Sequence, residues 1–130
     1  MNPLMKNAPQ IAYIESEPDL RSVITGTLQR HGFAVSVYET SKSFLPDFEV
    51  GLFDLIYSGT HTPKIGEGFE LFRQIRKIDP GQKYIFGSAC MLCSNLFPQV
   101  FPNSDCILIK YPVTMGVIVG KIKEHRGAKT

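Results

Sequence analysis

The sequence lacks any apolar run long enough to span a membrane, and residues 1–10 lack the apolar segment of a secretion signal. We therefore expect a cytoplasmic protein without a membrane partner. Cysteine is scarce, and an odd total of three argues for reduced thiols rather than a disulfide framework. An excess of one charge is also missing, since 14 basic and 12 acidic residues leave a net charge of +2. We read the basic residues near the C-terminus as a solvated helix end, and we expect no direct nucleic-acid binding by this domain.

What the chain does contain is the composition of one soluble globular domain. Its 130 residues are enough to bury a hydrophobic core, and 43% of them are apolar while 20% are charged. Residues 1–9 carry two prolines and no periodic pattern. We predict a flexible leader over 1–9, one domain over 10–126 and a short tail over 127–130.

Short apolar segments alternate with helical patterns along the chain. Strands are predicted at 11–14, 33–38, 54–58, 84–86 and 107–109, and helices at 41–48, 69–78, 112–124 and from Pro18 onward. The segment 90–104 contains Pro98 and Pro102, so we expect an irregular fourth helix there. This alternation predicts an α/β fold with a mainly parallel sheet and helices on both faces.

The most informative stretch is the central strand, which runs from Asp54 to Ser58. Ligands of open parallel α/β sheets bind at the carboxyl ends of the strands. Here that end holds Ser58, Gly59 and Thr60, with no carboxylate, thiol or imidazole, and His61 follows in the loop. Three of the other four strands also end in polar or small residues, and we expect these to meet the central strand around one pocket: Glu15, Ser16, Glu17, Gly87, Ser88 and Lys110.

Several stretches resemble the receiver domains of bacterial two-component response regulators. They are Glu-Pro-Asp-Leu-Arg at 17–21, Asp-Leu-Ile at 54–56, Gly-Glu-Gly-Phe-Glu-Leu-Phe-Arg-Gln-Ile-Arg at 66–76, and Lys110. The resemblance covers roughly residues 11–124. It implies a flavodoxin-like, doubly wound sheet of five parallel strands in the order 2-1-3-4-5.

The resemblance also implies a site, in which an acidic pair binds Mg²⁺, an aspartate accepts a phosphoryl group, and a hydroxyl and a lysine assist. These roles fall on Glu15 and Ser16, on Gly59, on Ser88 and on Lys110. Gly59 has no side chain to phosphorylate and Ser16 has no charge, so we expect a degenerate phosphosite, weak or absent Mg²⁺ binding and no other cofactor. The predicted function is phosphorylation-independent protein–protein interaction in signal transduction, without enzymatic activity.

Two structural expectations follow for this degenerate site. A partly buried Lys110 needs a counter-ion, and we predict an ion pair with Glu15, or in second place with Glu17, that locks one conformation. Receivers also carry an aromatic reporter three residues before the lysine, and Ile107 stands at that position here.

A partner surface is predicted on the segment after the fourth strand and on Ile107. Its apolar members in that segment are Met91, Leu92, Leu96, Phe97 and Phe101. They indicate a docking face for a signalling or output protein, or for a second copy of the chain. The alternative is that they cover the sheet.

Other readings remain open at this stage. Cys90 and Cys93 form a Cys-x-x-Cys, which can be a redox dithiol or half of a zinc site, although Cys106 has no close partner in the sequence. The alternative is that these thiols are idle, and we predict no metal site. A third reading is a receiver that still signals through Ser88 or His61, although nothing near His61 in the sequence orients its ring.

Overall fold

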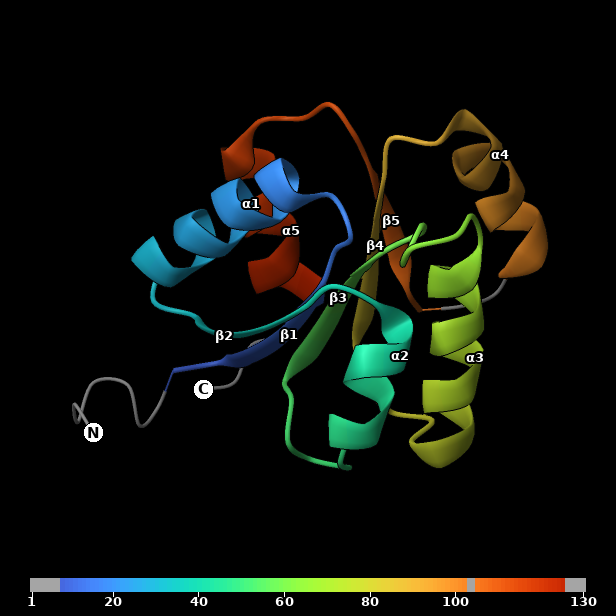
Figure 1. The fold of residues 1–130 in the computed structure, drawn as a ribbon, viewed down its shortest axis with the longest axis horizontal. Helices are drawn as coiled ribbons and strands as arrows, with labels where there is room; N and C mark the ends of the chain where they lie inside the picture. The colour runs from blue at the N-terminus through green and yellow to red at the C-terminus, as the bar shows by residue number, and fades with distance from the viewer. Residues whose placement is uncertain (1–7, 103–104, 126–130) are drawn as a thin grey trace.

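A computed structural model describes residues 8–102 and 105–125 of the chain. Its centre is a parallel five-stranded sheet in the order β2-β1-β3-β4-β5 (Figure 1). The strands are β1 (Gln10–Ile14), β2 (Ala34–Tyr38), β3 (Leu55–Gly59), β4 (Tyr84–Ser88) and β5 (Ile107–Lys110). The helices are α1 (Pro18–Arg30), α2 (Ser41–Phe44) with a 3-10 turn η2 (Leu45–Asp47), α3 (Glu67–Ile78), α4 (Met91–Val100) and α5 (Met115–His125). The predicted fold class and strand order are confirmed.

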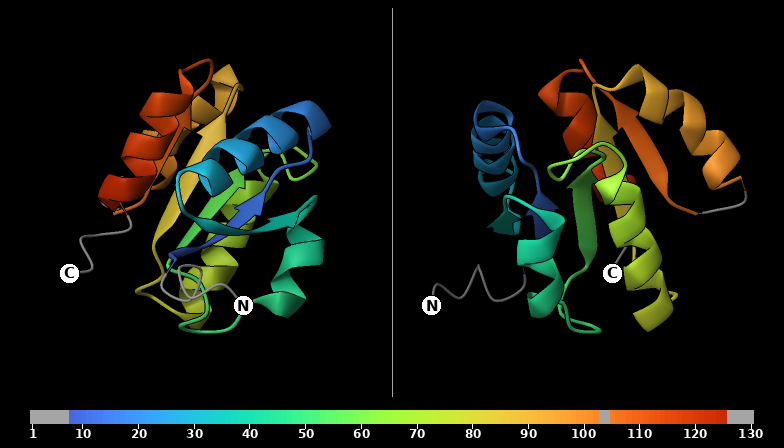
Figure 2. Two further views of the ribbon diagram at one scale, coloured as in Figure 1. Left: turned by 90° about the vertical axis from the view of Figure 1, so that its left-hand side faces the viewer. Right: turned by 45° about the vertical axis from the view of Figure 1, so that its right-hand side comes forward.

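The helices cover both faces of the sheet, with α1 and α5 on one face and α2, α3 and α4 on the other (Figure 2). Successive side chains of a strand point to opposite faces, so each strand contributes to both cores. In β3, Leu55 and Tyr57 pack toward α1 and α5, whereas Ile56 packs toward α3 and α4. All five residues of β3 are buried, as predicted for a central strand.

Helix α1 begins where the sequence predicts. Pro18 occupies its first turn, and the side chain of Glu17 accepts hydrogen bonds from the backbone N–H groups of Asp19 and Leu20. This cap satisfies two of the N–H groups that a helix start leaves unpaired.

The prediction of an irregular fourth helix is wrong. Helix α4 is a regular α-helix of 10 residues that includes Pro98. A proline disrupts a helix by removing one N–H and crowding the preceding turn, so this helix needs tertiary packing that offsets the cost of Pro98. Phe97 and Phe101, one turn apart, pack on Phe86 of the sheet with centroid distances of 5.8 and 5.9 Å. This packing stabilises the last turn.

Smaller differences concern the other helices and the termini. The helix predicted over 112–124 begins at Met115, because the hydroxyl of Thr114 accepts a hydrogen bond from Val117 N and caps the start. The helix predicted over 41–48 is short, and Pro46 lies in its 3-10 turn. Most of the predicted leader and all of the predicted tail lie outside the described residues. Within the described part of the chain, every helix is too short or too polar to cross a bilayer.

Candidate functional site

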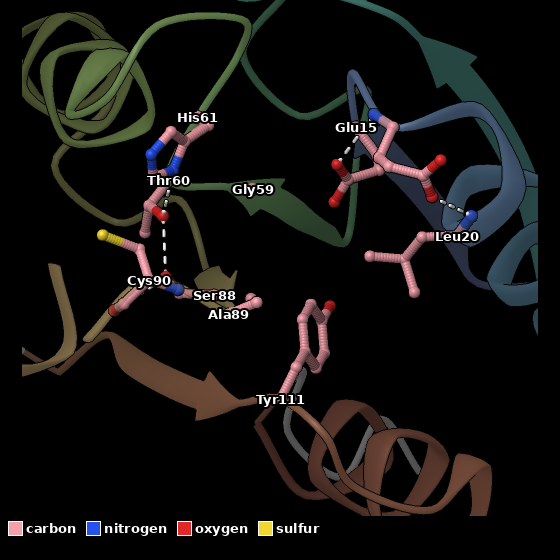
Figure 3. A pocket seen from close by; sticks show the side chains of 11 residues that line it. Glu15, Leu20, Gly59, Thr60, His61, Ser88, Ala89, Cys90 and Tyr111 are labelled. Carbon is pink, nitrogen blue, oxygen red and sulfur yellow. Dashed lines mark hydrogen bonds between the residues drawn. The ribbon is translucent and has the colours of Figure 1, made fainter. Parts of the chain in front are cut away.

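A cavity of about 480 Å³ lies at the carboxyl end of the sheet, where the sequence predicts a pocket (Figure 3). Residues from the ends of β1, β3, β4 and β5 converge on it. Its lining consists of Glu15, Glu17, Leu20, Gly59, Thr60, His61, Gly87, Ser88, Ala89, Cys90 and Tyr111. Of the predicted phosphosite positions, Glu15, Gly59 and Ser88 line the cavity, whereas Ser16 and Lys110 do not. The side chain of Ser16 instead donates a 2.6 Å hydrogen bond to the carbonyl of Glu39.

Gly59 lies at the end of β3, and the carboxylate of Glu15 fills the space beside it. A Cβ placed on Gly59 would lie 3.1 Å from Oε1 of Glu15, closer than an ordinary van der Waals contact. Helix α3 closes the other side, since Gly68 N donates a 3.2 Å hydrogen bond to the carbonyl of Thr60. The end of the central strand therefore lies between Glu15 and α3, beside the cavity, and Gly59 has no side chain of its own.

Glu15 is an acid in an environment that disfavours its charge. The residue is only 7% exposed. Burial raises the pKa of its carboxyl above the usual 4.5, and a hydrogen bond from the backbone N–H of Glu17 opposes part of that rise. The nearby Arg21 donates its 2.8 Å hydrogen bond to the backbone carbonyl of Glu15 rather than to the carboxylate.

Because burial raises the pKa of Glu15, replacing it by a neutral side chain should stabilise the protein to a degree that depends on pH. The charged form is destabilising in the folded state, so Glu15→Gln should increase the free energy of unfolding at neutral pH. The gain should shrink as pH falls through the raised pKa and vanish below the usual 4.5, where Glu15 is protonated in both states. Urea unfolding across this pH range measures the difference. The exposed control Glu49→Gln should follow the wild type, and a gain that stays constant with pH would contradict the argument.

The predicted ion pair between Lys110 and Glu15 is wrong. Lys110 is exposed, and among the described residues no ion pair joins it to Glu15 or Glu17. The reason is the alternation of side chains along β5: Ile107 and Ile109 pack toward α1 and α5, and Lys110 points the other way. The next residue, Tyr111, returns to the side of Ile109 and lines the cavity. The side chain that faces the cavity at the end of β5 is therefore that of Tyr111, one position after the lysine that the sequence predicts there.

The hydroxyl of Tyr111 forms a hydrogen bond with the hydroxyl of Tyr57, which is fully buried in β3. Burial raises the pKa of both phenols, so both are neutral at physiological pH. This pair joins the end of β5 to the central strand. The Tyr111 ring lies on the side of the cavity opposite to Thr60 and His61 (Figure 3).

Tyr111→Phe should lower the free energy of unfolding by about 1–3 kcal/mol, because it leaves the buried hydroxyl of Tyr57 without this partner. Lys110→Met, one residue away but exposed, should change it by less than about 0.5 kcal/mol. Urea unfolding of both variants checks the contrast. If Lys110→Met lowered the free energy of unfolding as much as Tyr111→Phe or more, Lys110 would have a stabilising contact that an exposed side chain lacks.

Ser88 is buried and already engaged. Its hydroxyl lies 2.8 Å from Oγ1 of Thr60 and accepts a 3.0 Å hydrogen bond from Cys90 N. It therefore links the ends of β3 and β4 to the start of α4. A hydroxyl held in this way is less free to move toward a ligand in the cavity.

The structure divides the predicted partner surface. Met91, Leu92 and Leu96 of α4 are 76%, 56% and 38% exposed. Phe97 and Phe101 instead pack against the core between α3 and the sheet. Ile107 is partly buried against the core on the α1 and α5 face. Only the first three residues thus form an exposed apolar patch.

Sequence reasoning missed one cluster at the edge of the cavity. His61 follows β3, Cys90 caps α4 and Cys93 lies in its first turn, and their ligand atoms all lie within 4.8 Å of one another. The Cys-x-x-Cys spacing is visible in the sequence, but His61 joins it only because β3 and β4 are neighbours in the sheet. Backbone hydrogen bonding from Cys93 lowers the pKa of the Cys90 thiol, whereas burial raises the pKa of Cys93.

No protein-family model matches the chain, and no curated protein matches its sequence. Solved structures do match. A receiver domain protein from Methanospirillum hungatei is 23% identical with a TM-score of 0.79, and the match covers 92% of this chain and 94% of that one. A receiver protein from Sinorhizobium medicae is 19% identical with a TM-score of 0.80, over 96% and 99% of the two chains.

A third similar structure is the response regulator TrrA from Thermotoga maritima, solved in complex with Mg²⁺ and BeF. It is 25% identical with a TM-score of 0.74, and the match covers 89% of this chain and 97% of that one. The sheet order and the five helices agree with these likenesses. The chain therefore has the fold of response regulator receiver domains.

Proposed function

We propose that this chain is a degenerate receiver, which takes part in signal transduction by binding another protein and does so without being phosphorylated. The observation that carries the proposal is the end of β3. Gly59 stands where the family resemblance places the phosphoacceptor, and the Glu15 carboxylate lies against it. An acyl phosphate needs a carboxylate side chain at this point, and glycine offers none.

The charges around the cavity support the same conclusion. Glu15 and Glu17 contribute two carboxylates, and among the described residues that line the cavity only His61 can carry a positive charge. A phosphoryl group is anionic and needs cations or N–H donors around it. Lys110 points away, and the neutral Tyr111 stands in the cavity instead. An anion would therefore bind poorly.

Magnesium is also expected to bind weakly. Mg²⁺ prefers one or two carboxylates together with oxygens of the substrate. Ser16 is turned away toward Glu39, and no carboxylate is available at Gly59. The carboxylate of Glu17 is engaged in capping α1, and Glu15, buried and with a raised pKa, is a poor substitute for an acidic pair.

A fixed conformation at the strand ends supports constitutive binding. The hydrogen bonds Thr60–Ser88 and Tyr57–Tyr111 connect β3 to β4 and to the end of β5. We infer that these contacts hold the protein in one receiver state. Among the described residues, the exposed patch Met91, Leu92 and Leu96 on α4 is the surface we propose for the partner, which is a signalling or output protein or a second copy of the chain.

The deciding experiment adds Mg²⁺ and beryllofluoride, a phosphoryl mimic, and follows the amide NMR spectrum. The expected result is no saturable shift at Gly59, Thr60 or Ser88. A receiver that carries an acceptor aspartate serves as the positive control in the same buffer. Saturable shifts at these residues would mean that an anion site survives and would overturn the proposal.

Phosphorylation at another side chain is tested separately, by incubation with acetyl phosphate and intact-mass spectrometry. We expect no phosphoryl adduct. An adduct on Ser88 or His61 would favour the reading in which the chain still signals through a different phosphosite.

A further inference from the structure

Two elements far apart in the sequence bring metal-binding side chains together at the edge of the cavity. His61 comes from the loop after β3, and Cys90 and Cys93 come from the start of α4. One ligand atom from each lies within 4.8 Å of the other two. His61 and Cys90 are half-buried and Cys93 is buried, so the cluster is shielded but can be reached from the cavity.

The two cysteines are placed by the first turn of α4. Cys90 is the N-cap of the helix, and its sulfur accepts a 3.3 Å hydrogen bond from Cys93 N. This N–H and the positive end of the helix dipole both stabilise a thiolate at Cys90. Because Cys93 follows one turn later, its sulfur lies on the same side of the helix.

The histidine is oriented by the ends of β3 and β4. Thr60 Oγ1 lies 3.3 Å from Nδ1 of His61, and the same hydroxyl is held 2.8 Å from Ser88 Oγ. A backbone bridge between His61 and Ile65 fixes the loop itself. A ring held at Nδ1 can bind a metal through Nε2, which is the usual division of roles for a ligating histidine. Figure 3 shows the His61 ring, Thr60 and the Cys90 sulfur on the same side of the cavity.

We propose that His61, Cys90 and Cys93 form a binding site for one Zn²⁺ ion, with the fourth tetrahedral position open to water or to an added ligand. Two thiolates and a neutral imidazole are ligands that Zn²⁺ prefers and that Mg²⁺ and Ca²⁺ avoid. Their two negative charges balance the charge of the ion, which suits a half-buried place. Zinc bond lengths correspond to ligand separations of about 3.3–3.8 Å, so the cluster closes by about 1 Å around the ion.

This site goes beyond the proposed function and does not depend on it. Zinc would connect the loop after β3 to α4, and the helix residues Met91 and Leu92 directly follow Cys90 at the exposed patch. Zinc binding would therefore affect the surface proposed for a partner, and this effect would not involve Gly59. The beryllofluoride experiment and a zinc titration can fail independently of each other.

The test is a titration of the full chain, reduced and freed of metal with a chelator under anaerobic conditions. Co²⁺ is added first as a spectroscopic substitute for Zn²⁺. The expected result is one equivalent bound, with the visible bands of tetrahedral Co²⁺ and a thiolate-to-cobalt charge-transfer band. Zn²⁺ should then displace the cobalt, and a large excess of Mg²⁺ should not.

Variants assign the ligands. Cys90→Ser, Cys93→Ser and His61→Ala should each weaken binding by at least about 100-fold, since loss of even an outer-shell partner costs about 10–100-fold. Cys106→Ser is the matched control, because this third thiol is buried at the start of β5 and does not belong to the cluster, and it should bind normally. Amide spectra show whether each variant folds. If Cys93→Ser does not fold, His61→Ala still tests the site, because His61 is only half-buried.

Three outcomes would overturn the site. The first is cobalt bound without a charge-transfer band, and the second is an equal loss of binding in Cys106→Ser. The third is a fully reduced Cys90–Cys93 pair that binds no metal, which would leave these thiols as a redox pair or as idle groups.

Discussion

Replacing Gly68 by alanine is expected to lower the free energy of unfolding by about 3 kcal/mol. Gly68 lies in the first turn of α3, where the helix backbone meets the end of β3. An added Cβ would overlap the carbonyl oxygen of Gly59 and would lie 2.9 Å from the Cα of Thr60. Both are backbone atoms, so no side chain can rotate away. The helix or the strand end must move.

Denaturation in urea measures the change, and amide shifts at Gly59 and Thr60 should show where the backbone moves. Gly120→Ala is the matched control, since this glycine lies in α5 with open space around its Cβ position. That variant should stabilise the protein by up to about 1 kcal/mol, because alanine is the better helix former. If the two substitutions had the same effect, the close approach of α3 to β3 would be wrong.

Phe86→Ala is expected to destabilise the protein by about 3–5 kcal/mol. Phe86 lies in β4, is fully buried and forms the centre of an aromatic cluster. Its ring lies 5.0 Å from Phe69, 5.6 Å from Phe72 and 5.9 Å from Phe101, measured between centroids. Alanine would remove the surface on which α3 and the end of α4 both pack.

The control is Phe86→Leu, which retains most of the volume and should cost clearly less. Thermal and urea unfolding compare the two, and amide exchange should rise most in α4. A small effect of Phe86→Ala would show that the cluster can collapse around the cavity, and it would remove our explanation for a regular helix that contains Pro98.

The fold could be predicted from the sequence because its signals are local. A buried apolar run such as 54–58 and a helical pattern such as 69–78 each report their own structure, and their alternation implies the parallel sheet. Pro98 misled the prediction for α4, because the aromatic packing that stabilises this helix comes from residues distant in the sequence.

The site was harder to predict because its geometry depends on register. Gly59 and Ser88 both line the cavity, but a one-residue difference at the end of β5 separates an exposed Lys110 from a cavity-lining Tyr111. The cluster of His61 with Cys90 and Cys93 forms only because the ends of β3 and β4 lie side by side in the sheet. Residue spacing along one segment carries no such information.

The contact between Glu15 and Gly59 also limits what a side chain at position 59 could do. An aspartate substituted at position 59 would place its Cβ 3.1 Å from the carboxylate oxygen of Glu15. Two carboxylates would then share a buried space, and each negative charge would raise the pKa of the other. Under the proposed function, an aspartate at position 59 is therefore expected to be a poor acceptor unless Glu15 moves or is replaced as well.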